Sequence, residues 1–391
     1  MNVVGEEVVR AAYRRGQRKV VAEPTDIVTP QALDAVDRLG MRLLRAPTTK
    51  APPLSTEPGR ALSRTLYRRH PGFVPAGRRT NVRAVRFDKI AIIGAGGMGS
   101  ALAGLLASEG ACDRVKIVDL IPGLAASVAE DLRQAAPLIG KSTDVVSGTD
   151  RADIAGADVV VVAPEAACLP GMTEVLLGEV QLAAESIASH APDAVVIFGG
   201  WPSEVFTEQL RRSGNLAPEK VIGTGATLAS VRLVNALAAH AGVAREEVEA
   251  VALGADGAYV PLLSSARVRG RAVGDVLRPS ELEAALADAR VAADHVQSLR
   301  STRPPAIAPA HAALEIVNAL RGARPGPVPA SVWLDDQYGV EDTVLGVNAT
   351  LNQHGLKSVV EVPLSADERT AVQAAANGVR RGLQALAELQ V

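Results

Sequence analysis

Aromatic residues, cysteines and long apolar runs are all scarce in this sequence. Phe, Trp and Tyr make up 3% of the 391 residues although 48% are hydrophobic, so the core must be built mainly from Ala, Val and Leu. Small aliphatic residues suit helices packed on a parallel sheet. The two cysteines, Cys112 and Cys168, give neither a disulfide framework nor a set of metal ligands. No apolar run could span a bilayer, and the first residues lack the hydrophobic core of a signal peptide. We therefore expect a cytoplasmic protein without a metal.

Charge is distributed unevenly along the chain, although the net charge is only −2. Residues 1–89 contain 18 Lys and Arg against 8 Asp and Glu, and the remaining residues contain 23 against 35. A basic N-terminal arm before an acidic body predicts an arm that docks on a partner. Nucleic acid is a poor candidate for that partner, because the aromatic and glycine spacing of known nucleic-acid-binding domains is missing. The alternatives are another protein and the acidic body itself, in the same or a neighbouring subunit.

The first 45 residues predict a small module of helices and short strands. The apolar positions of residues 3–15 fall on one face of a helix, with arginines opposite. The residues of that face are Val4, Val8, Ala11 and Ala12. A short strand should follow, then a turn, a helix capped by Thr29 with Pro30 at its first position, and another strand. Residues 46–87 are rich in Pro, Arg and Gly without a period, which is the composition of a linker.

Strands alternate with helices from Asp88 to about residue 220. The stretch "KIAIIGAGGMGSALAGLLASEG" combines a buried strand, a glycine turn and an Ala/Leu helix, and "RVKIVDL", "ADVVVVAP" and "DAVVIFGGWP" supply three further apolar strands. This alternation predicts an α/β domain over residues 88–220 with a doubly wound parallel sheet, the Rossmann fold. A mixed pattern follows, with a hairpin-like "ARVRGRAV" and long helices. It predicts a second, α+β domain over residues 221–391.

The glycine turn predicts a dinucleotide site. Gly94, Gly96 and Gly99 fit G-x-G-x-x-G, and Asp119 ends the next strand 20 residues after the last of them. The first glycine allows a tight turn, the second lets the backbone approach a pyrophosphate, and the third lets the helix pack closely. Asp119 should accept hydrogen bonds from the ribose hydroxyls and repel a 2′-phosphate, which favours NAD over NADP. The alternative is a turn kept only for packing. The other residues expected beside the cofactor are Gly97, Met98 and Ala163.

Four segments between Lys89 and about Val362 resemble the malate/lactate dehydrogenase family in order and spacing. They are "KIAIIGAGGMGSALAGLLAS…RVKIVDL", "DIAGADVVVVAP…LPGMTEVLLGEV", "PEKVIGTGATLASVRL" and "WLDDQYGVEDTVLGVNATLNQHGLKSVVEVPL". The resemblance implies the family's fold, a small-molecule substrate and a homo-oligomer, a dimer or tetramer. The N-terminal segment also loosely resembles the leader modules of enzymes housed in bacterial microcompartments, which would place the protein inside one. An ordinary oligomerisation arm is the alternative.

The resemblance also implies where the catalytic groups of the family should stand. The family uses a histidine in a G-G-H-G turn, oriented by the aspartate of an L-D-x-x-R helix whose arginine pairs with the substrate carboxylate. Two loop arginines and an asparagine before a proline complete its site. In this sequence "LGADG" has Asp256 at the histidine position, while "LASVR" keeps Arg232 and has Ala229 for the aspartate. In "EAACLPGMTE" and "GGWP", the arginine and asparagine positions hold Cys168, Glu174 and Trp201.

Asp256 is therefore the candidate proton shuttle, and Arg232 is the candidate ligand of a substrate carboxylate. An aspartate of ordinary pKa, about 4, is a poor proton donor at neutral pH, so Asp256 could act only if burial raised its pKa. The alternative is an inert ion pair between the two residues. Tyr259 is close enough in sequence to act as an acid or to pack beside Asp256. Arg303 falls in the segment that faces the substrate, His311 is a substitute shuttle, and Cys168 and Trp201 are possible substrate contacts.

These residues lead to one hypothesis and two rivals. The hypothesis is an NAD-dependent oxidoreductase of the malate/lactate dehydrogenase type, acting on a small carbonyl or hydroxy compound other than malate or lactate. The first rival is a catalytically inactive NAD-binding sensor or scaffold protein, which Trp201 and Ala229 favour. The second is a structural partner recruited through the N-terminal module.

Overall fold

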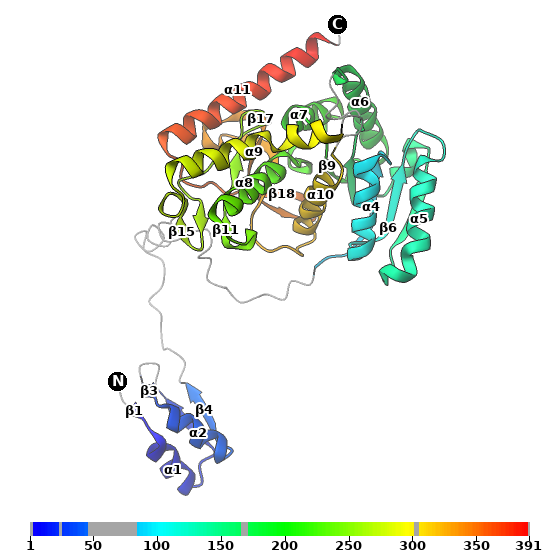
Figure 1. Cartoon of the computed structure of the whole chain (residues 1–391). Helices are drawn as coiled ribbons and strands as arrows, with labels where there is room; N and C mark the ends of the chain where they lie inside the picture. Colours follow the sequence, from blue (N-terminus) through cyan, green and yellow to red (C-terminus); the bar gives the residue numbers. More distant parts are fainter. Residues whose placement is uncertain (1–2, 23–25, 46–83, 166–170, 301–304, 390–391) are drawn as a thin grey trace. The chain divides into compact units, whose positions relative to one another are not determined.

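The computed structural model describes residues 3–22, 26–45, 84–165, 171–300 and 305–389. The linker expected at 46–87 therefore lies almost entirely outside the described residues. By its contacts the chain divides into two compact units, residues 1–78 and 79–391 (Figure 1). Among the helices of the described ranges, none is long and apolar enough to cross a membrane.

The small unit consists of two successive strand–helix–strand segments. Its elements are β1 (Val3–Val4), α1 (Glu6–Arg14), β2 (Lys19–Ala22), β3 (Ile27–Val28), α2 (Pro30–Arg38) and β4 (Arg42–Arg45). Strand β1 pairs with β3 and β2 pairs with β4, both parallel. The predicted cap of α2 is confirmed: the Thr29 hydroxyl accepts a hydrogen bond from the Ala32 amide at 3.3 Å, and Pro30 is the first helical residue.

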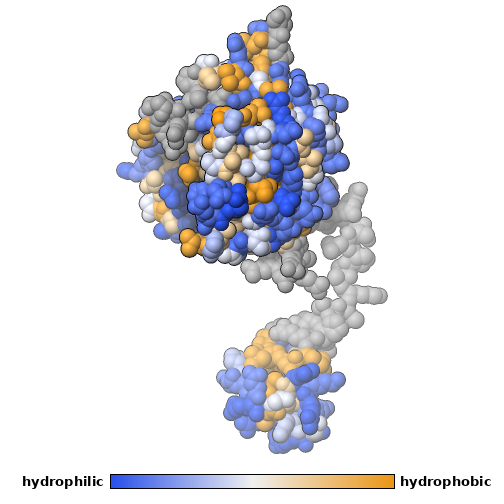
Figure 2. All heavy atoms as spheres, turned by 90° about the vertical axis from the view of Figure 1, so that its right-hand side faces the viewer, coloured by the Kyte–Doolittle hydropathy of each residue, from blue (hydrophilic) through white to orange (hydrophobic). Residues whose placement is uncertain are grey.

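The buried face of α1 differs from the predicted one. Val9 and Ala12 are buried, whereas Val8 is 46% exposed, so the prediction was wrong for Val8. The reason is that Val4 lies in β1 and not in the helix, and the spacing from Val4 to Val8 therefore does not define a helical face. Figure 2 shows hydrophobic residues at the surface of this small body. Its exposed large hydrophobic residues are Val3, Val8, Tyr13, Val21, Ile27, Leu33 and Leu44.

The large unit begins with a parallel sheet in the order β7-β6-β5-β8-β9-β10. The strands are β5 (Phe87–Ile93), β6 (Cys112–Val118), β7 (Asp144–Gly148), β8 (Val159–Val162), β9 (Val195–Phe198) and β10 (Val221–Gly223). Numbered along the chain this order is 3-2-1-4-5-6, that of the doubly wound dinucleotide-binding fold. The connecting helices are α4 (Gly97–Glu109), α5 (Leu124–Ile139), α6 (Thr173–His190) and α7 (Ser203–Ser213). The predicted fold class is confirmed.

Three antiparallel strands extend this sheet on its β10 side to nine strands. They are β16 (Val328–Asp335), β17 (Glu341–Asn352) and β18 (Gly355–Val359). The join is antiparallel, with Gly223 of β10 opposite Ser331 of β16. The helices of this half are α8 (Gly225–Ala241), α9 (Pro279–Arg300), α10 (Ile307–Leu320) and α11 (Ala366–Glu388). Its short strands are β11 (Val248–Glu249), β12 (Ala252–Leu253), β13 (Val260–Pro261), β14 (Arg267–Val268) and β15 (Arg271–Ala272).

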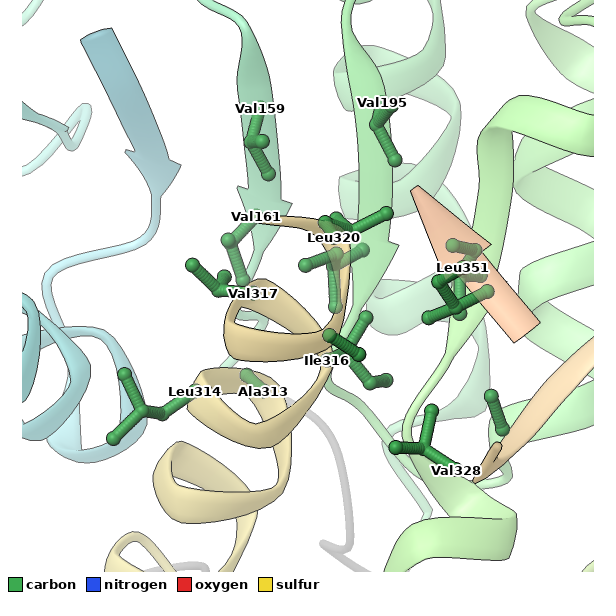
Figure 3. Packing of buried hydrophobic residues seen from close by; sticks show 14 of the residues in the cluster. Val159, Val161, Val195, Ala313, Leu314, Ile316, Val317, Leu320, Val328 and Leu351 are labelled. Atoms are coloured by element: carbon green, nitrogen blue, oxygen red, sulfur yellow. The ribbon is translucent and has the colours of Figure 1, made fainter. Parts of the chain in front are cut away.

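Helices cover both faces of the large sheet. Alternate strand residues point to opposite faces, and Val159 and Val161 belong to one buried cluster while Val160 and Val162 belong to another. Helices α4, α5, α10 and α11 contribute to the first cluster, and α6 and α7 contribute to the second. Figure 3 shows α10 lying against the strands, with Val317 and Leu320 facing Val161 and its neighbours. The core is built chiefly from Ala, Val, Leu and Ile, as the scarcity of aromatic residues predicts.

A glycine pair attaches the loop after β12 to the large sheet. Gly254 and Gly346 exchange two backbone hydrogen bonds, of 2.9 and 2.7 Å. Gly254 has a φ of +104°, and a Cβ there would lie 2.8 Å from the Ala258 carbonyl oxygen, so the turn requires glycine. Asp256 follows two residues later and is thereby held against the sheet.

Candidate active site

Two of the three glycines in the turn after β5 stand where a side chain would collide with backbone. Gly94 has a φ of +106°, and a Cβ there would lie 2.3 Å from the Ala163 carbonyl oxygen. A Cβ on Gly99 would lie 1.9 Å from the Gly94 carbonyl oxygen, so α4 packs directly on the turn. Strand β5, the turn and α4 are therefore as close as backbone allows.

The third glycine, Gly96, lies at the start of α4 close to the Glu165 side chain. Its φ of −64° is open to any residue, and a Cβ there would point at the Glu165 carboxyl group, 2.9 Å away. Helix α4 has no acidic residue in its first turn. The amides of its first turn and the positive end of the helix dipole favour an anion, such as the flexible Glu165 carboxylate or a pyrophosphate in its place.

Asp119 lies beside a cavity of about 210 Å³ next to this turn. Its Oδ2 accepts a hydrogen bond from the Ala95 amide at 2.7 Å, and its Oδ1 accepts one from the Ile121 amide at 2.8 Å. The cavity is mainly apolar, and Gly94, Gly96 and Ala163 also line it. An apolar pocket beside a carboxylate and a helix N-terminus fits the adenosine part of a dinucleotide.

The two other turn residues expected at the cofactor lie differently. Met98 is buried, and its Cε lies 2.1 Å from where a Cβ of Gly199 would be. Met98 therefore packs against the turn that follows β9. A Cβ on Gly97 would lie 3.1 Å from the Ala306 Cβ, so Gly97 faces the start of α10. Neither residue lines the 210 Å³ cavity.

Asp256 lies against the start of α7. The Ser203 amide donates a short hydrogen bond to Asp256 Oδ2. The Asp256 amide in turn donates to Glu204 Oε2 at 3.0 Å. The Asp256 side chain is half-buried, whereas Glu204 is 0% exposed. The structure thus brings two carboxyl groups together that are 52 residues apart in the sequence.

Glu204 is held by hydroxyl groups from two further segments. Its Oε1 accepts hydrogen bonds from Tyr259 at 2.8 Å and from Ser331 at 2.6 Å. The Ser331 hydroxyl oxygen accepts in turn from the Ala226 amide at 3.2 Å, in the first turn of α8. A Cβ on Gly225 would lie 2.5 Å from Glu204 Oε1, so α8 begins directly against this carboxyl group.

The two carboxyl groups differ in how burial and neighbours affect their ionisation. Burial and, after it, the neighbouring Asp256 charge raise the pKa of Glu204 from its ordinary value of 4.5 to about 8. Burial also raises the pKa of Asp256, but hydrogen bonds from Ser203, Glu204 and Tyr259 and the charge of Arg232 lower it. Burial and the two carboxyl groups hold the pKa of Tyr259 well above 10, so Tyr259 stays protonated. Adjacent carboxyl groups with different environments are a recurring arrangement in acid–base catalysis.

Arg232 acts on Asp256 at longer range. It projects from α8, is half-buried, and lowers the pKa of Asp256 through its charge. Within the part of the chain that the structure describes, no ion pair joins the two residues. Ala229 is buried one turn earlier on the same helix.

The remaining sequence candidates do not join the carboxyl groups. Trp201 is 45% exposed in the turn before α7. His311 is exposed on α10 and borders a separate cavity of about 250 Å³ against α4 and α5. Glu174 is exposed in the first turn of α6. Cys168 and Arg303 lie outside the described residues. In those residues, no three His, Cys, Asp or Glu side chains are grouped to hold a metal ion.

Glu204 was missed by the sequence analysis. A glutamate in the first turn of a helix is usually a solvated residue at the positive end of the dipole. One signal was available: Glu204 directly follows the turn "GGWP" at the carboxyl end of a buried parallel strand, the edge where ligand sites of such sheets gather.

Family models and known proteins match the large unit. Residues 88–223 match the model described as lactate/malate dehydrogenase, NAD binding domain, and residues 226–389 match the alpha/beta C-terminal domain of the same family. Malate dehydrogenase of Bacteroides fragilis is 31% identical over 313 residues, covering 77% of this chain and 99% of that protein. Malate dehydrogenase of Thioalkalivibrio sulfidiphilus is 30% identical over 305 residues, covering 76% and 99%.

Solved structures give the same result. Lactate dehydrogenase from Cryptosporidium parvum, complexed with lactic acid and nicotinamide adenine dinucleotide, superposes with a TM-score of 0.74 at 25% identity. The match covers 77% of this chain and 98% of that one. Malate dehydrogenase from Cryptosporidium parvum superposes with a TM-score of 0.74 at 26% identity, covering 78% and 100%. Both family models begin after residue 87, so the small N-terminal unit lies outside them.

Proposed function

We propose, from the premise that this chain belongs to the lactate/malate dehydrogenase family, that it transfers hydride between NAD and a small carbonyl or hydroxy compound other than malate or lactate. The observation that carries the proposal is the place of Asp256. It occupies the position at which the family pattern calls for a histidine, and it is hydrogen-bonded at the start of α7 beside a second, buried carboxyl group.

The cofactor is NAD, and its site is built by the first half of the sheet. The turn at Gly94 and Gly96 and the start of α4 would hold the pyrophosphate. Asp119, at the cavity of about 210 Å³, would accept the ribose hydroxyls and repel the 2′-phosphate of NADP. When bound, the nicotinamide supplies or accepts the hydride.

The substrate is proposed to carry at most one carboxylate. Arg232 is the cation that the family pattern retains for that group. The loop positions of the two further arginines hold Cys168 and Glu174. A second carboxylate, as in malate, would therefore meet a negative charge in place of a guanidinium group. Trp201, at the asparagine position, offers an apolar surface instead of an amide.

The small N-terminal unit is proposed to be a docking unit rather than part of the active site. It has its own core of buried residues, and several large hydrophobic side chains remain exposed on its surface together with arginines. The unit could dock in one of two ways. It directs the enzyme into a microcompartment as a leader, or it joins subunits as an arm.

The test is a titration of the full chain with NADH, followed by turnover. Fluorescence should show NADH binding at least tenfold tighter than NADPH. In the same cuvette, 2-oxo monocarboxylic acids other than pyruvate, or simple aldehydes, should oxidise NADH faster than oxaloacetate and pyruvate do. For a 2-oxo acid, Arg232→Ala should raise KM at least tenfold because the carboxylate loses its bidentate partner; an aldehyde should be unaffected.

Each other result has a definite meaning. Oxaloacetate or pyruvate as the best substrate would make the proposed substrate class wrong. NADH binding without any turnover would favour the inactive sensor or scaffold. Failure to bind NADH would overturn the whole proposal.

A further inference from the structure

We propose that the carboxylate of Glu165 occupies the pyrophosphate position of the cofactor-free chain, so that NAD must displace it in order to bind. Glu165 is then an affinity-determining residue, because the protein itself supplies the anion that competes with the cofactor. The inference rests on the pyrophosphate position proposed above, but it does not depend on the substrate or on hydride transfer.

The backbone fixes where Glu165 leaves the sheet. Strand β8 ends at Val162, and the next residue, Ala163, still donates its amide hydrogen to the Ile93 carbonyl of β5 at 2.9 Å. The Ala163 carbonyl oxygen lies 2.3 Å from where a Cβ of Gly94 would be. Ala163 is thus in contact with the glycine turn, and the side chain of Glu165, two residues later, begins beside that turn.

The Glu165 side chain reaches over the start of α4. A Cβ on Gly96 would lie 2.9 Å from Glu165 Oε2 and 3.0 Å from its carboxyl carbon. Gly96 is the N-cap of α4, and the first turn of this helix contains no acidic residue. The positive end of the helix dipole is therefore faced by a carboxylate from another segment, as it would be by a bound anion.

A bound dinucleotide must pass through the same place. Ligands of such sheets lie outside the carboxyl ends of the strands, where the strand order reverses, and here that point lies between β5 and β8. Asp119, directly after β6, marks the adenosine side of this point, and Glu165, after β8, stands on the other side. Both residues line the cavity of about 210 Å³. The pyrophosphate that joins the two halves of NAD therefore meets the Glu165 carboxylate.

Charge prevents the carboxylate and the pyrophosphate from sharing the start of α4. The pyrophosphate brings two negative charges of its own. Among the described residues, the other charged side chains that line the cavity are Asp119, Glu179 and Arg151, so one cation stands against three carboxyl groups. Glu165 is exposed, and its side chain can turn outward into water. Moving it away from the helix lowers the affinity for the cofactor, by about tenfold for a charge a few ångströms away.

The first test removes the charge of the side chain and keeps its shape. Glu165→Gln should bind NADH about tenfold more tightly than the unmodified chain does in a fluorescence titration at about 0.05 M salt. The gain should shrink at about 0.5 M salt, because salt screens the repulsion. Glu185→Gln is the matched control. Glu185 is exposed on α6 and does not line the cavity, and its replacement changes the net charge equally. It should leave the affinity unchanged.

The second test locates the effect with two ligands that lack the nicotinamide, adenosine and ADP. By calorimetry, Glu165→Gln should bind ADP more tightly than the unmodified chain does, because ADP carries the two phosphates. Its affinity for adenosine should not change, because adenosine lies on the Asp119 side of the turn. An equal gain for both ligands would mean that the whole cavity has changed, and it would overturn the inference.

The third test needs no ligand. In the cofactor-free chain the Glu165 carboxylate stabilises the positive end of α4, so Glu165→Gln should lower Tm by roughly 1–2 °C. Saturating NADH should reverse the order of the two proteins, because the variant binds NADH more tightly. A variant that melts no lower than the unmodified chain in the absence of NADH would contradict the contact between the carboxylate and the helix.

The outcomes distinguish this inference from the proposed function. Unchanged NADH binding in Glu165→Gln would refute the competition and leave the NAD site intact. Weaker binding would mean that the carboxylate holds the cofactor itself, for example through a ribose hydroxyl, and would also refute it. Tighter ADP binding in a chain that turns over no substrate would support the competition and overturn the proposed hydride transfer. Failure of both proteins to bind NADH and ADP would overturn the cofactor site.

Discussion

Replacing Gly94 by alanine should weaken NADH binding by about tenfold to a hundredfold. A non-glycine residue held at a φ of +106° costs roughly 1–3 kcal/mol. The new Cβ would also lie 2.3 Å from the Ala163 carbonyl oxygen. Ala163 is itself fixed, because its amide donates to the Ile93 carbonyl at 2.9 Å. The turn can relieve the strain only by moving away from Ala163. Cofactor binding would then require the turn to return to its strained position, and the strain energy would be lost from the binding free energy. Each loss of about 1.4 kcal/mol weakens the affinity tenfold.

Fluorescence titration with NADH is the assay, and Gly104→Ala is the control. Gly104 lies in the interior of α4, and a Cβ there would meet the Leu132 Cδ2 at 3.6 Å, an ordinary van der Waals distance. This variant should bind NADH normally and gain about 0.5–1 kcal/mol of stability, since alanine favours helix over glycine. If the Gly94→Ala variant folds and binds NADH as tightly as the unmodified chain, the argument from strain in the turn is refuted.

Two further predictions concern stability and assembly. At Glu368, burial alone would raise the pKa, but hydrogen bonds from Ser365 and Ser264 outweigh it and hold the pKa below 4.5. A depressed folded-state pKa stabilises above the unfolded value and is lost as pH falls through the folded one. Glu368→Gln should therefore cost about 1 kcal/mol at pH 7, the size of a helix cap, and urea unfolding should show the difference shrinking below pH 4.5. Deleting residues 1–83 should leave NADH affinity unchanged. It should lower the molar mass of the assembly by more than the mass of the deleted segments, because the number of subunits falls. An unreduced subunit number by light scattering would contradict docking on a neighbouring subunit.

The NAD-binding half was predictable because its signals are local. A buried strand, a turn containing Gly94 and a helix follow one another directly, and Asp119 ends the next strand. The cap at Thr29 was predictable for the same reason. Val8 was placed on the wrong face because a spacing of four residues indicates a helical face only if both residues are helical.

The carboxyl pair was only half predictable because its partners are distant in sequence. Asp256 could be found from the resemblance, which fixes what stands at each motif position. Glu204 lies 52 residues before it, and Ser331 follows Glu204 by 127 residues. What brings them together is the pairing of β10 with β16 and the glycine bridge at Gly254, and no local pattern encodes either contact.

The pairing of β10 with β16 decides how this enzyme can move. Glu204 belongs to the first half of the chain and Asp256 and Ser331 to the second, yet all three rest on one continuous sheet. A hinge that opened the two halves like a clamshell would have to break that sheet and pull apart the hydrogen bonds around Glu204. The halves should therefore unfold in a single cooperative transition. Access for the substrate must come from loops outside the sheet, while the two carboxyl groups stay at a fixed separation throughout turnover.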